Sequence, residues 1–135
     1  MYQQMIFVNL ATNDVDASKK FFTELGYTIN PQFSGDDCAC VVISDTIVTM
    51  LLSKERYADF TKKEIADSTR TSEVLICLSA ESREKVDELV EKAVAAGGRA
   101  NDDVQDHGYM YGRSFDDLDG HSWEVVWMDP AAVQS

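Results

Sequence analysis

The predicted order of strands and helices occurs twice along the chain, and this internal repeat restricts the fold more than any single motif does. In the first half, Asp14 begins a helix that Gly26 ends, and strands are predicted at residues 5–11, 27–30, 38–43 and 46–52. In the second half, Ser82 caps a helix that Gly97 and Gly98 stop, and strands are predicted at residues 73–80, 99–105, 109–115 and 122–128. The chain is therefore predicted to consist of two β-α-β-β-β modules.

The length of 135 residues is sufficient for one compact unit with a real core. We expect a single α+β domain over residues 1–135, with module one at about 4–53, a connecting arm at 54–71 and module two at about 72–129. The apolar residues of the arm have helical spacing, which predicts a short amphipathic helix within it. The arm either packs on the sheet or forms a lid over a pocket, and the sequence leaves both open.

The net charge of −12 argues against a nucleic-acid partner, because phosphate binding requires clustered Lys and Arg. No apolar run approaches the roughly 20 residues that span a bilayer, and the first residues do not resemble a signal peptide. We therefore expect no membrane partner and a cytoplasmic location. Acidic pairs at 36–37, 102–103 and 116–117 lack the spacing of a calcium-binding loop and are interpreted as solvated turns.

The three cysteines do not suggest a disulfide framework, because their number is odd and the expected setting is cytosolic. Cys38 and Cys40 are predicted to share one face of a strand. A thiol pair for metal or redox work is one interpretation of them. We favour the other, that they are small buried residues, because free cysteine behaves as a small hydrophobe in most proteins.

The last predicted strand contains one carboxylate, Glu124, among residues that are mostly apolar. A buried carboxylate without a partner costs several kcal/mol, on the order of a lost hydrogen bond or more, so Glu124 should have a specific neighbour or ligand. It is a candidate general base, or it is held by hydrogen bonds from a tyrosine hydroxyl, Arg113 or the backbone. His121 is interpreted as a turn residue, and a site made of His121 and Glu124 is disfavoured because residues three apart on a strand face opposite sides.

The repeated modules, the first-helix pattern Asp14, Ser18, Phe21-Phe22, Leu25-Gly26 and the ending Asp119-Gly120-His121-x-Trp123-Glu124 together resemble the vicinal oxygen chelate superfamily. This superfamily includes glyoxalase, bleomycin resistance proteins and extradiol dioxygenases. The resemblance covers nearly the whole chain and implies a glyoxalase-like fold, in which two modules form a curved mixed sheet around a cavity. It also implies a homodimer.

The resemblance further implies four positions for the ligands of a divalent metal, and the chain retains a ligand at one of them. Glu124 matches the final-strand glutamate, whereas Phe7 and Leu75 stand at the positions on the first strand of each module. Residues 46–52, which would supply the remaining ligand, contain no His, Glu or Asp. Because phenylalanine and leucine have no lone pairs to donate, we predict no resident metal and no other cofactor.

If the register of the resembling family holds, the predicted ligand-binding side chains are Phe7, Asn9, Leu75, Cys77, Tyr111, Arg113 and Glu124. Such a mostly apolar concavity with a few polar groups is typical of a small-molecule pocket. Trp123 and Trp127 are expected to point away from it, into the packing against the helices. We therefore predict a protein that binds a small organic molecule without a metal. The alternative is a metal-dependent lyase, isomerase or dioxygenase in which Glu124 is catalytic.

Overall fold

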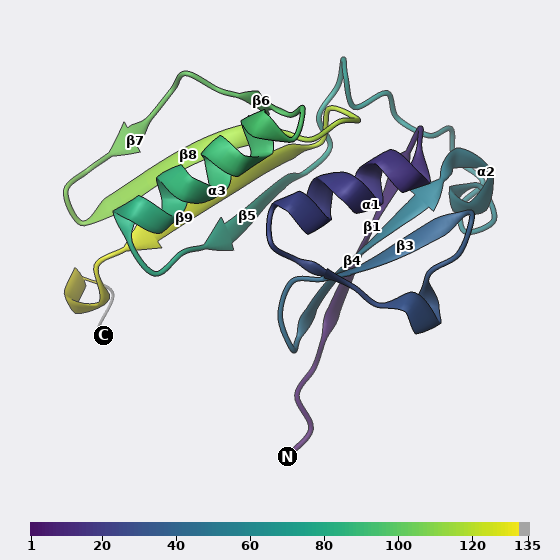
Figure 1. Ribbon diagram of the computed structural model, residues 1–135, viewed down its shortest axis with the longest axis horizontal. Coiled ribbons are helices and arrows are strands. Elements are labelled where there is room, and N and C mark those ends of the chain that lie inside the picture. Colours follow the sequence, from purple (N-terminus) through teal and green to yellow (C-terminus); the bar gives the residue numbers. More distant parts are fainter. Residues whose placement is uncertain (133–135) are drawn as a thin grey trace. The chain divides into compact units, whose positions relative to one another are not determined.

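The computed structural model describes residues 1–132 as strands, helices and their connections, and the chain divides into two compact units, Met1–Asp67 and Ser68–Ser135. The division falls within the predicted connecting arm. Each unit contains one mixed sheet (Figure 1). The first unit has the predicted β-α-β-β-β order, and the second has it with the strand after the helix divided into two short strands. The α+β class predicted from the sequence is therefore confirmed. No helix among residues 1–132 is long and apolar enough to cross a membrane.

The first unit has a four-stranded sheet in the order β1-β4-β3-β2, in which β1 is parallel to β4 and the other pairs are antiparallel. Its elements are β1 (Ile6–Thr12), α1 (Val15–Glu24), β2 (Thr28–Ile29), the 3-10 turn η1 (Pro31–Phe33), β3 (Cys38–Val42), β4 (Ile47–Ser53) and α2 (Lys54–Tyr57). Helix α1 begins where predicted, because the Asp14 side chain accepts a hydrogen bond from the backbone N–H of Ala17.

The core of the first unit lies between α1 and the sheet. Phe21 and Phe22 of α1 are almost completely buried and pack edge to face, with ring centroids 5.0 Å apart. The hydroxyl groups of Thr12 and Ser18 are hydrogen-bonded at 2.6 Å, which joins β1 to α1. Of the two cysteines on β3, Cys40 is buried as predicted and Cys38 is half-buried.

The connecting arm forms less helix than predicted. Ser53 caps α2 by accepting from the backbone N–H of Arg56, but the helix ends after four residues. Phe60, one of the arm's apolar residues whose helical spacing predicted a longer helix, is exposed. A short helix gains little stability from helix propensity alone and needs to bury an apolar face. Because Phe60 is not buried, the helix does not continue beyond Tyr57.

The second unit has β9 at the centre of its sheet, parallel to β5 on one side and antiparallel to β8 on the other. Its elements are β5 (Leu75–Ser79), α3 (Arg83–Ala95), β6 (Arg99–Ala100), β7 (Gln105–Asp106), β8 (Met110–Asp116), β9 (Ser122–Met128) and the 3-10 turn η2 (Pro130–Ala132). Ser82 caps α3 by accepting from the backbone N–H of Lys85, as predicted. The helix lies along one face of β8 and β9 (Figure 1).

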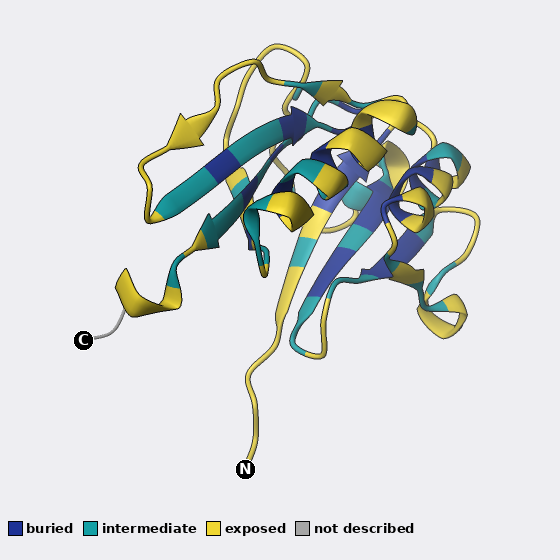
Figure 2. Ribbon diagram, turned by 60° about the vertical axis from the view of Figure 1, so that its left-hand side comes forward, coloured by how far each residue is buried: buried dark blue, intermediate teal, exposed yellow. Residues whose placement is uncertain are grey.

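The predicted strand at residues 99–105 is interrupted. Within this segment, β6 and β7 each pair with β8, and the residues between them form an exposed loop (Figure 2). The Asn101 side chain accepts a hydrogen bond from the backbone N–H of Asp103, which is an Asx turn and competes with a continuous ladder. The polar run Asn101-Asp102-Asp103 therefore breaks the strand.

Candidate functional site

Glu124 lies on the face of the second sheet that α3 does not cover. Its neighbours along β9, Trp123 and Val125, are completely buried on the α3 side. Because side chains alternate along a strand, Glu124 points to the opposite face. It pairs with Cys77 of β5 and Ser114 of β8, so these three residues form a row across the sheet.

This open face is hollowed around Glu124 and has a cavity volume of about 400 Å³. Ligand sites of small molecules occupy about 300–1,000 Å³, so the hollow has room for a modest organic molecule. Its wall is formed on one side by the loop that joins β6 and β7. The lining residues are Cys77, Asn101, Asp103, Gln105, Met110, Gly112, Arg113, Ser114, Glu124, Val126 and Met128.

Glu124 is half-buried and has no hydrogen bond or ion pair with another residue in the part of the chain that the structure describes. Arg113, the predicted structural partner of Glu124, donates its hydrogen bond to Asp87 on α3 instead. The charge of Glu124 does affect its neighbour: burial, and then the Glu124 charge, raise the pKa of the Cys77 thiol. The Cys77 thiol is exposed and faces the hollow beside the Glu124 carboxylate.

Tyr111 and Arg113 lie on the other face of β8 from Glu124, so they do not share its side of the sheet. The Tyr111 hydroxyl donates to Oδ1 of Asp87 on α3 at 2.6 Å, and Arg113 donates to the same oxygen at 3.0 Å. The hydrogen bond from Tyr111 is the largest cause of the lowered pKa of Asp87. Arg113 still borders the hollow, but its guanidinium charge is matched by Asp87.

Arg83, at the start of α3, binds β7 and the turn that follows it, next to the loop that walls the hollow. Its guanidinium donates to both carboxylate oxygens of Asp106 at 2.9 Å and to the carbonyl of Gly108 at 3.0 Å. It also lies 5.1 Å from the ring centroid of Tyr111 and 5.3 Å from that of Trp127. Bidentate binding combined with two aromatic faces fixes the guanidinium in one orientation. The predicted placement of Trp127 on the helix side is confirmed.

The ion pair between Arg83 and Asp106 predicts an acid-sensitive contribution to stability. The hydrogen bonds from Arg83 lower the pKa of Asp106 to about 2. Because the folded pKa is below the unfolded value, the contribution is complete above about pH 4 and is lost as the pH falls toward 2. Melting temperatures of the wild type and Asp106→Asn should differ by a constant amount above pH 4 and converge below it. Asp102→Asn, in the adjoining loop, is the control. Plots of melting temperature against pH for the wild type and Asp106→Asn that stay parallel down to pH 2 would contradict the prediction.

In the first unit, the predicted side chains Phe7 and Asn9 are on one face of β1 and both are exposed. Asn9 borders a separate hollow of about 270 Å³, whose other lining residues are Leu52, Tyr57, Phe60 and Thr61. The Asn9 amide donates to the backbone carbonyl of Phe7 at 3.3 Å. The start of the connecting arm therefore borders the same face of the sheet as Asn9.

The donors present do not fit the divalent metal that the resemblance implies. Phe7 and Leu75 stand at two of the ligand positions, both side chains are more than half exposed, and neither has a lone pair. On the open face of the second sheet, the neighbour of Glu124 that could also bind a metal is the Cys77 thiol. Burial and the charge of Glu124 raise the pKa of this thiol, which favours its protonated form. A carboxylate and a protonated thiol are too few for a tetrahedral site or a facial triad.

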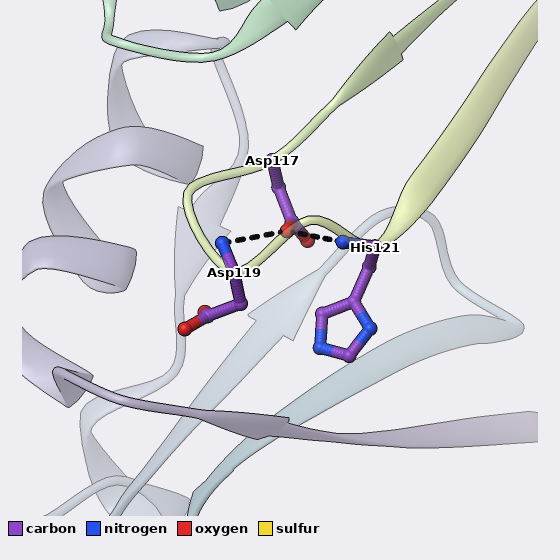
Figure 3. Close-up of side chains that lie close together, drawn as sticks. All are labelled: Asp117, Asp119 and His121. Atoms are coloured by element: carbon purple, nitrogen blue, oxygen red, sulfur yellow. Dashed lines mark hydrogen bonds between the residues drawn. The ribbon is translucent and has the colours of Figure 1, made fainter. Parts of the chain in front are cut away.

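A second group of possible metal ligands lies in the turn between β8 and β9, where Asp117, Asp119 and His121 bring their ligand atoms within 4.8 Å of one another (Figure 3). Asp117 Oδ1 accepts from the backbone N–H groups of Asp119 at 3.0 Å and His121 at 2.9 Å. Its Oδ2 accepts from the indole N–H of Trp123 at 3.0 Å. The Asp117 carboxylate thus organises the turn by accepting three hydrogen bonds.

The interpretation of the acidic pairs as solvated turns was correct for residues 36–37 and 102–103 but wrong for Asp117, which is only 6% exposed. Burial raises the pKa of Asp117, against the opposing effects of His121 and the hydrogen bonds. No short motif marks this arrangement. The signal available in the sequence is an aspartate six residues before a tryptophan, across a turn that contains Asp119-Gly120.

Comparison with known proteins gives one family match and many structural matches. Residues 4–44 match the family model of the bleomycin resistance protein-like N-terminal region. No curated protein matches the chain by sequence.

Three solved structures illustrate the likeness in fold. A hypothetical protein from S. aureus is 29% identical, with 94% of each chain covered and a TM-score of 0.78. A glyoxalase/bleomycin resistance protein/dioxygenase family enzyme from Burkholderia phytofirmans is 18% identical, covers 93% of this chain and 99% of its own, and has a TM-score of 0.76. Lactoylglutathione lyase from Agrobacterium tumefaciens is 15% identical, with 93% and 94% covered and a TM-score of 0.67. The predicted glyoxalase-like fold is confirmed.

Proposed function

We propose that this chain is a member of the vicinal oxygen chelate superfamily and that it binds a small organic molecule without a resident metal. The family match over residues 4–44 and the glyoxalase-like fold support this proposal. The proposed site is the open face of the second sheet, with Cys77 and Glu124 at its base and Arg113 at its border. Leu75 lies on the same face of β5, outside the hollow itself. Homodimer assembly and a cytoplasmic location remain predictions from the sequence.

One observation carries this proposal: a half-buried carboxylate without a protein partner, among the residues that the structure describes, lies at the base of a hollow of about 400 Å³. A structural glutamate would be satisfied by hydrogen bonds, as Asp117 and Asp87 are in the same unit. The apolar side chains around it, including Val126 and Met128, supply the contact area that a small ligand requires.

The rival is a lyase, isomerase or dioxygenase that uses Glu124 as a metal ligand or a base. The two proposals differ in what they require of the protein as isolated. A metal enzyme of this type should hold close to one equivalent of metal, and Ni²⁺, Zn²⁺ or Fe²⁺ should stabilise it by several degrees. The proposed binding protein should do neither, because Phe7 and Leu75 provide no ligand atoms.

The test begins with protein purified without chelator, whose metal content is measured by elemental analysis. Thermal shifts are then recorded with each divalent cation. A panel of small aromatic and aliphatic compounds, with cationic, neutral and anionic members, is screened by two-dimensional amide NMR. We expect no stoichiometric metal, and we expect ligand-induced shifts at the amides of Cys77, Ser114 and Glu124. Stoichiometric metal, or shifts confined to other parts of the chain, would overturn the proposal.

Glu124→Gln is expected to leave the melting temperature within about 2 °C of the wild type, because the carboxylate holds no protein partner within the described residues. Compounds that bind through the carboxylate should lose affinity. Glu91→Gln, on the exposed surface of α3, removes the same charge from the same unit and is the matched control. A large loss of stability in Glu124→Gln, with binding unchanged, would mean that Glu124 has a structural role.

A further inference from the structure

The charges that border the hollow on the second sheet are not balanced. Glu124 lies at its base, and Asp103 lies on the loop between β6 and β7 that walls it. The only cationic residue at its border is Arg113, whose guanidinium donates to Asp87 on the helix side of the sheet. Asp87 is in turn the shared acceptor of Tyr111 and Arg113. Among the described residues that line it, the hollow therefore presents two carboxylates and one cation, Arg113, which forms an ion pair with Asp87.

The remaining surface of the hollow is apolar or neutral. Met110, Val126 and Met128 border it, and the thioethers of methionine are polarisable groups that adapt to ligands of differing shape. The Cys77 thiol adds no positive charge, and burial, followed by the charge of Glu124, raises its pKa. The whole chain carries a net charge of −12, so the surrounding field also attracts cations and repels anions.

We propose that the ligand of this hollow is an organic cation, a protonated amine attached to an apolar body. Its ammonium group lies against the carboxylate of Glu124, and its apolar body lies on Met110, Val126 and Met128. Asp103 stands where it can attract the same charge from the wall. Charge-assisted hydrogen bonds of this type are about twice as strong as neutral ones, so the terminal group of the ligand should dominate selectivity. This inference rests on the proposed function and names the chemical class of its ligand.

The test compares three probes that share a phenyl ring and a short chain but differ in the terminal group. These are 2-phenylethylamine, which is cationic, 2-phenylethanol, which is neutral, and 3-phenylpropanoate, which is anionic. Dissociation constants are measured by NMR titration at neutral pH. We expect the amine to bind about tenfold more tightly than the alcohol, and the anion to bind most weakly. Raising the salt concentration should weaken only the binding of the amine.

Variants then locate the charge. Glu124→Gln should lower the affinity for the amine about tenfold and change the affinity for the alcohol by less than about twofold, because only the amine interacts with the carboxylate charge. Asp103→Asn, in an exposed loop, should weaken the amine about threefold and cannot disturb a buried core. Glu91→Gln should change neither. If Glu124→Gln fails to fold, Asp103→Asn still tests the inference.

The possible outcomes separate this inference from the proposed function. If the alcohol or the anion binds as tightly as the amine at the hollow, the ligand is not selected by positive charge and the inference is overturned, whereas the proposed function stands. If none of the three binds while other members of the wider panel do, the inference is overturned in the same way. If metal ions alone shift the amides of Cys77 and Glu124 and the amine does not, both proposals fail.

Discussion

Replacing Asp117 with alanine is expected to lower the free energy of unfolding by about 3 kcal/mol and the melting temperature by about 10 °C. The carboxylate accepts the backbone N–H groups of Asp119 and His121 and the indole N–H of Trp123, and alanine leaves all three donors without it. Because Trp123 is completely buried, its indole N–H has no access to water as a replacement acceptor. Urea unfolding followed by circular dichroism measures the difference.

Two further variants separate charge from hydrogen bonding in this turn. Asp117→Asn keeps one carbonyl oxygen as an acceptor, and it removes the charge whose burial raises the pKa of Asp117. The free energy of unfolding should therefore fall by less than in Asp117→Ala, by about 1 kcal/mol. Trp123→Phe removes the indole donor, and the double variant with Asp117→Ala should show a coupling energy of about 1–2 kcal/mol. Asp45→Ala, in the exposed turn between β3 and β4, is the control. Equal effects of Asp117→Ala and Asp45→Ala would contradict the role assigned to Asp117.

Gly120→Ala is the second substitution for which we expect a large effect, a loss of about 2–3 kcal/mol in the free energy of unfolding. Gly120 has a φ of +86°, where a side chain is strained. In addition, a Cβ atom would lie 2.9 Å from the carbonyl oxygen of Ser68 and 3.0 Å from the Cα of Thr69. The Ser68 hydroxyl donates to the carbonyl of Asp119 at 2.8 Å, so the backbone of this segment is held against the turn.

Gly108→Ala is the matched control, because Gly108 has a φ of +80° but no atom within 4 Å of the position of a Cβ. It should show the conformational strain alone, about 1 kcal/mol. The difference between the two variants, measured by chemical unfolding, therefore reports the contact with Ser68 and Thr69. If the two losses are equal, that contact contributes nothing to stability.

Local patterns were sufficient to predict the elements that are defined by local chemistry. Asp14 and Ser82 were predicted as helix caps, and both accept the expected backbone hydrogen bond. The strand predicted at residues 122–128 has the same bounds in the structure as β9. The internal repeat and the C-terminal motif were sufficient to predict the fold. In contrast, the prediction of one strand over residues 99–105 was wrong, because an Asx turn at Asn101 competes with the strand pairing there.

The candidate site was less predictable, because its geometry depends on pairs that are distant in the sequence. The face on which Tyr111 and Arg113 lie follows from the register of β8 against β9, which pairs Arg113 with the buried Val125. That register depends on the geometry of the turn between β8 and β9 as well as on the hydrophobic pattern of the strands. Arg83 and Asp106 likewise meet across 23 residues. Alternation did predict correctly that Trp123 and Glu124 face opposite sides of the sheet.

The way the loop between β6 and β7 is attached has a consequence for how this protein can change in evolution. The loop has its own internal Asx turn, and one arginine from α3 fastens its far end. Substitutions in residues 101–104 therefore need not disturb the core, which lies between α3 and the other face of β8 and β9. The loop supplies Asn101 and Asp103 to the hollow, so substitutions in this stretch can change the polar lining of the hollow while the same sheet and helix are retained.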